Sequence, residues 1–241
     1  MFSIKSWVWC GVILLAIYGA SAAAMNVMVW HEARGVLREH PEYALLPQPL
    51  TDTKIADLSG GATVYRFGYK IQVPWTKVVA EKPTQSIVFP TFTDGGNMLI
   101  WDPPSAGSLA STARGQTAED RANAAALYGT QEVSSNYEFT AAAMRETGSE
   151  ISLFQPKIKN LRAMMLLFAK STHKATAIYA VSGGHFHGFQ TGDPKVPGVV
   201  QLLLFDEKDR ELSLWIGGTK KVAGVTQEQL NAMVASIQPP D

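Results

Sequence analysis

The pattern of hydrophobic and polar positions separates the first 30 residues from the rest of the chain. From Trp7 to Trp30 no residue carries a formal charge, and most side chains are apolar. A run of this length can cross the hydrocarbon core of a membrane, which requires about 20 residues. Trp7, Trp9 and Trp30 lie at its two ends, where indole rings favour the bilayer interfaces. The pattern predicts that residues 7–30 contact the membrane as a single-pass anchor.

A cleaved signal peptide is the alternative interpretation of residues 1–30. Lys5 would supply the basic start, residues 7–19 the apolar stretch, and the small residues of 20–24 the cleavage site. The apolar stretch 25–30 favours the anchor, because a mature N-terminus does not require it. With the N-terminus inside, the anchor predicts a protein of the cytoplasmic membrane with an extracytoplasmic domain. Cleavage predicts a secreted or periplasmic one.

A linker is expected over residues 31–50 and one globular domain over 51–241. Residues 31–40 can form a short polar helix, and Pro41, Pro47 and Pro49 then favour extended chain. Alternating aromatic and aliphatic residues over 63–73 predict a strand. Two further apolar runs, 86–93 and 97–101, flank the turn signal of Asp94 and two glycines.

Helices are expected in the middle of the chain. Capping patterns begin at Thr117 and Ser135, and the second helix is expected to end at Gly148. A third helix begins near Pro156. One face of it is marked by apolar residues at helical spacing: Ile158, Leu161, Met165 and Phe168.

Strands return at 176–181 and 185–190, and a hairpin is expected from 199–205 and 211–216. Thr226 then caps a last helix with Leu230, Met233, Val234 and Ile237 on its inner face. The order of strands, helices, strands and helix predicts an α+β fold. We expect an antiparallel sheet with helices packed on it, preceded by the N-terminal hydrophobic helix.

This order of elements, with the early segment YRFGYKIQVPW over residues 65–75, resembles the PsbP/Mog1-like α+β domains. The resemblance covers about residues 58–237. Members of that group are mostly accessory or binding proteins, so the resemblance implies a non-enzymatic role.

Charge and cysteine content exclude several classes of function. Lysine plus arginine and aspartate plus glutamate number 21 each, and no dense basic run occurs, which argues against a nucleic-acid partner. The single cysteine, Cys10, lies in the apolar segment. The remainder of the chain therefore cannot form a disulfide, a cysteine zinc site or a thiol nucleophile.

Two histidines are the candidate chemical site. His185 and His187 are two residues apart, so in a strand both would point to one side and could bind zinc or copper. His173 or Asp193 would supply a third ligand. The alternative is a pair of solvated histidines beside a glycine-rich bend.

Three functions follow from these features. The first is a membrane-tethered, extracytoplasmic, non-enzymatic domain that binds an envelope or membrane protein. The second is a metal-dependent hydrolase that uses His185 and His187. The third is a cleaved, secreted accessory protein.

Overall fold

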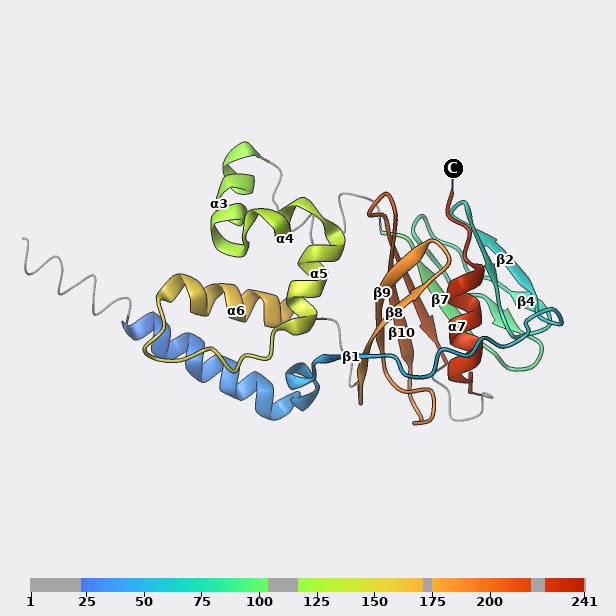
Figure 1. Cartoon of the computed structure of the whole chain (residues 1–241), viewed down its shortest axis with the longest axis horizontal. Coiled ribbons are helices and arrows are strands. Elements are labelled where there is room, and N and C mark those ends of the chain that lie inside the picture. Colours follow the sequence, from blue (N-terminus) through green and yellow to red (C-terminus); the bar gives the residue numbers. More distant parts are fainter. Residues whose placement is uncertain (1–22, 104–116, 171–174, 218–223, 241) are drawn as a thin grey trace, which may run out of the picture.

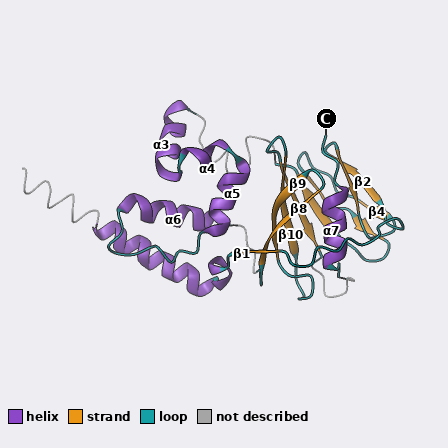
Figure 2. Cartoon of the chain, in the orientation of Figure 1, coloured by secondary structure: helices purple, strands orange, loops and turns teal. Residues whose placement is uncertain are grey.

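The computed structural model describes residues 23–103, 117–170, 175–217 and 224–240. The helices of the N-terminal and middle parts of the chain gather at one end of the molecule, and the sheet lies at the other end with α7 (Gln227–Ser236) packed on it (Figures 1 and 2). The helical part contains a helix over residues 23–39 and four further helices: α3 (Ala118–Tyr128), α4 (Thr130–Ser134), α5 (Asn136–Arg145) and α6 (Lys157–Ala169). A 3₁₀ turn, η1 (Pro41–Ala44), leads from the first helix to the sheet. The chain is thus α+β, as expected.

The main sheet has seven strands in the order β1-β8-β9-β10-β11-β7-β5. Their bounds are β1 (Pro47–Pro49), β5 (Ile87–Val88), β7 (Met98–Trp101), β8 (Ile178–Gly183), β9 (Phe186–Thr191), β10 (Val200–Asp206) and β11 (Glu211–Ile216). The sheet is mixed rather than purely antiparallel, because β1 pairs with β8 in parallel. Chain that was expected to be a linker therefore supplies an edge strand.

The expected single strand over residues 63–73 is a hairpin instead. β2 (Thr63–Arg66) pairs with β3 (Tyr69–Gln72) in antiparallel register. Phe67 and Gly68 form the turn with φ of 54° and 81°, a pair of positive values that matches the twist of a two-residue hairpin. A second small pair, β4 (Val78–Ala80) and β6 (Thr91–Phe92), lies beside it in the chain. The expected strand over 86–93 is thus divided between β5 and β6.

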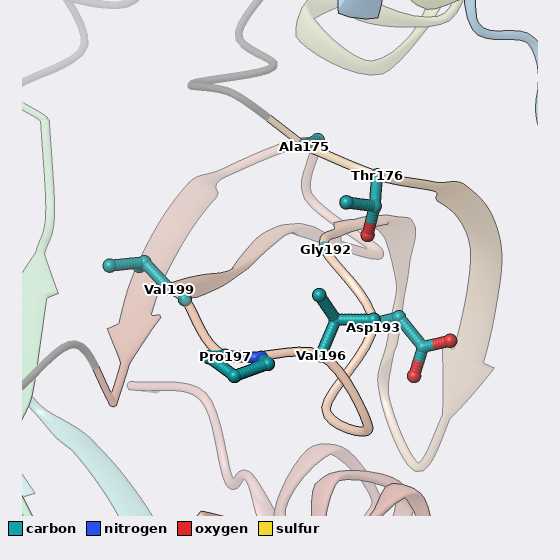
Figure 3. Close-up of a pocket in the computed structure, with 8 residues that line it drawn as sticks. Ala175, Thr176, Gly192, Asp193, Val196, Pro197 and Val199 are labelled. Carbon is teal, nitrogen blue, oxygen red and sulfur yellow. The ribbon is translucent and has the colours of Figure 1, made fainter. Parts of the chain in front are cut away.

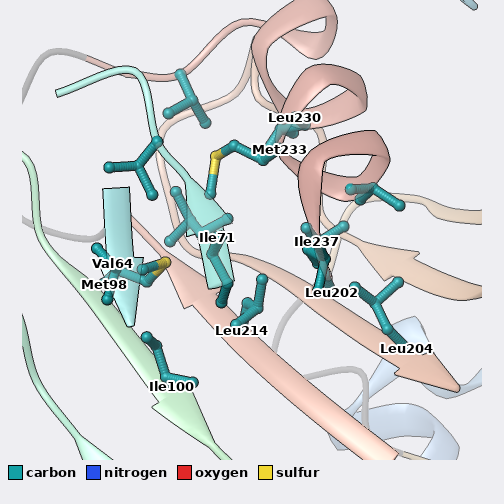
Figure 4. Packing of buried hydrophobic residues seen from close by; sticks show 14 of the residues in the cluster. Val64, Ile71, Met98, Ile100, Leu202, Leu204, Leu214, Leu230, Met233 and Ile237 are labelled. Atoms are coloured by element: carbon teal, nitrogen blue, oxygen red, sulfur yellow. The ribbon is translucent and has the colours of Figure 1, made fainter. Parts of the chain in front are cut away.

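The largest core lies between the sheet, the β2–β3 hairpin and α7 (Gln227–Ser236) (Figure 4). A capping box at Thr226 begins α7, as predicted, and the four residues expected on its inner face are all buried. On the sheet, alternate residues such as Leu202, Leu204 and Leu214 point into this core.

The opposite face of the sheet packs against α5. Ala141 and Met144 of this helix contact a cluster that includes Phe189, Leu203 and Phe205 of β9 and β10. Tyr137, in the first turn of α5, stacks against Phe189 at 5.9 Å between ring centroids. Helices therefore cover both faces of the sheet, and α5 joins the sheet to the rest of the helical part.

Helices α3, α4 and α6 pack around α5 at a distance from the sheet (Figure 1). Thr117 and Asp120 form the predicted capping box of α3, and Gly129 ends the helix. Arg162 of α6 donates to Glu132 of α4 and to the carbonyl oxygen of Tyr128, at 3.0 and 3.2 Å. These contacts join the four helices from the middle of the chain into one packed unit.

Candidate functional site

His185 and His187 lie at the β8–β9 hairpin, where their side chains contact different groups. His185 is in the two-residue turn, after Gly184, whose φ is 55°. Its exposed Nδ1 is 3.4 Å from the Glu207 carboxylate. His187 lies within β9 and packs its ring against Tyr137 of α5, at 4.3 Å between centroids. The prediction that both side chains point to one side assumed that both residues lie in a strand. His185 lies in the turn before β9, so the alternation of side chains along a strand does not apply to it.

The other expected ligands do not join the two histidines. Asp193 follows the opposite end of β9, and a strand of six residues spans about 20 Å. His173 lies outside the described residues. In the four described ranges, no group of three or more His, Cys, Asp or Glu side chains is placed to bind a metal ion. A zinc or copper site at His185 and His187 remains a prediction.

A pocket of about 280 Å³ lies around Asp193 (Figure 3). It is bounded by the start of β8 and by the loop between β9 and β10, and its lining is mainly Val, Pro, Gly and Ala. Among the described residues that line it, Asp193 is the only ionisable one, and its Oδ1 already accepts a hydrogen bond from the backbone of Lys195 at 2.9 Å. The described lining does not supply the converging polar groups that orient a small ligand.

The β10–β11 turn is attached to the N-terminus of α5 by Asp209. Its carboxylate accepts hydrogen bonds from the backbone of Asn136 and Tyr137, at 2.5 and 2.9 Å, and from Ser135 Oγ at 2.9 Å. Ser135 was expected to cap this helix with Glu138. Ser135 does accept from the Glu138 amide at 3.3 Å, but the charged cap comes from a turn distant in sequence.

A group of ionisable side chains lies next to this cap. Glu211 is 7% exposed, and burial together with the negative charges of Asp209 and Asp102 raises its pKa to about 7. Burial also raises the pKa of Asp102 and of Tyr69. Asp206, which is also buried, is bound by Arg210 at 2.6 Å. The group can hold a proton near neutral pH.

Lys170 joins three segments at the boundary between the helices and the sheet. Its ammonium group is buried and donates to the carbonyl oxygens of Tyr43, Leu45 and Glu146. All three of its N–H donors are thereby used. Burial lowers the pKa of Lys170 to about 8, and the charge of Glu146 opposes this shift. The ammonium group of Lys170 therefore connects the C-terminal ends of η1, α5 and α6.

The helix over residues 23–39 is fixed to the helical part by a buried amide pair. Asn160 Nδ2 of α6 donates to Asn26 Oδ1 at 3.0 Å, and Asn26 Nδ2 donates to the carbonyl oxygen of Gln155 at 2.9 Å. Val29 and Ala33 are buried against Ile151 and α6 in the same interface. Residues 7–22 of the expected membrane segment lie outside the described residues. In the part of the chain that is described, no helix combines the length and apolar composition needed to cross a membrane.

The helical part exposes a large apolar surface. On α6, three of the four residues that mark one apolar face are each about half exposed: Ile158, Met165 and Phe168. The fourth, Leu161, is partly buried against the cluster that holds the helix over residues 23–39. The buried face is formed by Ala163, Met164, Leu166 and Leu167 together with Asn160. Apolar residues lie on both sides of α6, so their spacing alone did not identify the buried side.

Sequence reasoning did not identify Asp209, Glu211, Lys170 or the Asn26–Asn160 pair. Each depends on a contact between segments far apart in the chain. The one available signal was Asn26, an amide within an otherwise apolar run. An isolated amide in such a run indicates a specific polar partner.

The chain matches no protein-family model, no curated protein and no solved structure in the comparisons with known proteins.

Proposed function

We propose that the protein is a membrane-tethered, non-enzymatic domain whose globular part is extracytoplasmic and binds an envelope or membrane protein beside the bilayer. One observation carries the proposal. The uncharged N-terminal run continues as the helix over residues 23–39, which is locked to α6 through Asn26 and Asn160. An anchor that ends in such a helix holds the helical part directly against the membrane.

The buried amide pair also gives the proposed anchor a boundary. Asn26 is enclosed by protein, so we infer that the hydrocarbon core of the bilayer ends before it. Residues 7–24 then remain for the N-terminal hydrophobic helix. At 1.5 Å per residue these 18 residues span about 27 Å, close to the thickness of a hydrocarbon core.

A protein partner is supported by the outer face of α6. Met165 and Phe168 are 48% and 51% exposed, and neighbouring apolar groups on a surface are typical of binding sites. The resemblance to PsbP/Mog1-like domains agrees with an accessory role and remains a prediction.

The proposal is tested by placing charge in the apolar run. In the double variant L14R/L15R two arginines would lie near the centre of the bilayer, at a cost of roughly 2.5–3.5 kcal/mol each. We expect wild-type protein to resist alkaline extraction from membranes and the variant to be lost from the membrane fraction. V79R, in β4, is the control and should fractionate as wild type. Wild-type protein that is released by alkali would contradict a tether.

Cleavage and secretion remain the second candidate, and one observation favours it. Met25, Val29 and Trp30 pack against α6 and Ile151, so the apolar residues after Ala24 have a role in folding. Their presence therefore no longer argues for an anchor over a signal peptide. The mass of the mature chain distinguishes an uncleaved anchor from a cleaved signal peptide.

A further inference from the structure

We propose that the end of the helical part farthest from the sheet lies in the headgroup region of the bilayer as a second membrane contact beside the anchor. This membrane-facing tip comprises Val27, Met28, Leu153, Phe154, Lys157, Ile158 and Lys159. The inference rests on the proposed tether and names the lipid surface as a partner of the domain itself.

The tip is formed by two segments that hydrogen bonds hold side by side: the start of the helix 23–39 and the loop before α6. Asn26 Nδ2 lies 3.4 and 2.9 Å from the carbonyl oxygens of Leu153 and Gln155, which fixes the loop before α6 against the first turns of the helix 23–39. Helix α6 then begins at this end of the molecule, away from the sheet (Figure 1). The loop and the start of α6 therefore lie where the anchor would enter the bilayer.

The apolar side chains of the tip point away from the protein. Phe154 is 97% exposed, Met28 61%, Val27 53%, Ile158 51% and Leu153 40%. Such a group, with a fully exposed phenylalanine, is typical of helices and loops that bury their apolar side at the boundary of headgroups and acyl chains. Nothing in the described chain covers Phe154.

The charge of the tip matches an anionic lipid surface. Residues 23–30 and 151–160 contain no Asp or Glu, whereas Lys157 and Lys159 are exposed on either side of Ile158. Basic side chains near a membrane are attracted by anionic headgroups within about a Debye length. Continuity with residues 7–24 selects the bilayer over a soluble protein, because the anchor would bring lipid to this surface whether or not a partner is present.

The test uses the full chain in vesicles of phosphatidylcholine with phosphatidylglycerol and a nitroxide-bearing lipid as quencher. Its single native thiol, Cys10, accepts an environment-sensitive fluorophore and reports insertion of the anchor. Two further proteins carry the label elsewhere on a C10S background: F154C at the tip and V79C in β4. Val79 is 61% exposed, and its strand β4 lies at the opposite end of the molecule (Figure 1), so this position is the matched control.

We expect blue-shifted emission and severalfold stronger quenching at position 154 than at 79. With K157Q/K159Q, quenching at 154 should fall in vesicles that contain phosphatidylglycerol. A label at Cys10 that is quenched, with labels at 154 and 79 that both emit as in water, overturns the tip contact and leaves the tether standing. A label at Cys10 that is not quenched overturns the tether, and with it the tip contact.

Discussion

At the scale of single residues, the buried carboxyl of Glu211 makes the stability of the fold depend on pH. Its side chain makes no hydrogen bond to another described residue, and its ordinary pKa of 4.5 is raised to about 7. The folded chain therefore retains a proton that the unfolded chain releases between these two values. This contribution to the free energy of unfolding is fully present below about pH 4.5 and is lost as the pH rises through about 7.

The substitution E211Q tests this dependence. Glutamine keeps the shape of a protonated carboxyl and carries no charge at any pH. We expect the variant to be more stable than wild type at pH 8, by up to about 3 kcal/mol, and nearly equal to it at pH 4.5. Urea unfolding across this range measures the difference. Parallel profiles for the two proteins would show that Glu211 ionises with an ordinary pKa.

Lys170 is the second residue whose burial has a testable consequence. In K170M the carbonyl oxygens of Tyr43, Leu45 and Glu146 lose their shared donor, although the aliphatic volume is kept. We expect the free energy of unfolding to fall by about 2–4 kcal/mol. K159M removes an exposed lysine from α6 and should change it by less than about 0.5 kcal/mol. Equal unfolding midpoints for K170M and K159M would contradict a stabilising role of the Lys170 hydrogen bonds.

At the scale of elements, α5 depends on a cap from the β10–β11 turn. D209G keeps the positive φ of 59° accessible and removes the carboxylate from the amides of Asn136 and Tyr137. We expect a loss of about 1–2 kcal/mol, with faster hydrogen exchange at the first amides of α5. D209N retains one acceptor oxygen and should recover part of the protection. Unchanged exchange at these amides in D209G would contradict the cap.

The two faces of α6 should respond differently to polar substitution. M165Q and F168Q alter the exposed face and should change stability by about 0.5 kcal/mol or less. L167Q places an amide on the fully buried face and should cost several times more. Thermal unfolding of the three variants distinguishes the faces. Comparable losses from both faces would mean that the outer face is also packed.

Elements were predictable from sequence where the pattern was local. The caps at Thr117 and Thr226 and the buried residues of α7 were recognised, because a capping side chain and its amide lie three residues apart. The β2–β3 hairpin was not, since Phe67 continues the aromatic alternation although Phe67 and Gly68 both have positive φ and form a turn. The spacing of apolar residues on α6 did not indicate which face is buried, because apolar residues lie on both sides of the helix.

At the scale of the whole molecule, the fold class was predictable and the contacts between elements were not. The parallel pairing of β1 with β8 and the capping of α5 by Asp209 join segments more than 70 residues apart. The candidate histidines were recognised by spacing alone. Their separation follows from the turn at Gly184 and from the packing of His187 on Tyr137, neither of which the spacing reveals.

We propose above all that an uncleaved apolar run tethers the helical part to a membrane. The intact mass of the protein from separated membrane and soluble fractions tests it most directly. We expect the mass of a chain that begins at Met1 or Phe2, and we expect to find it only in the membrane fraction. A mass that begins after Ala22, Ala23 or Ala24, found in the soluble fraction, would contradict the tether and identify a secreted domain.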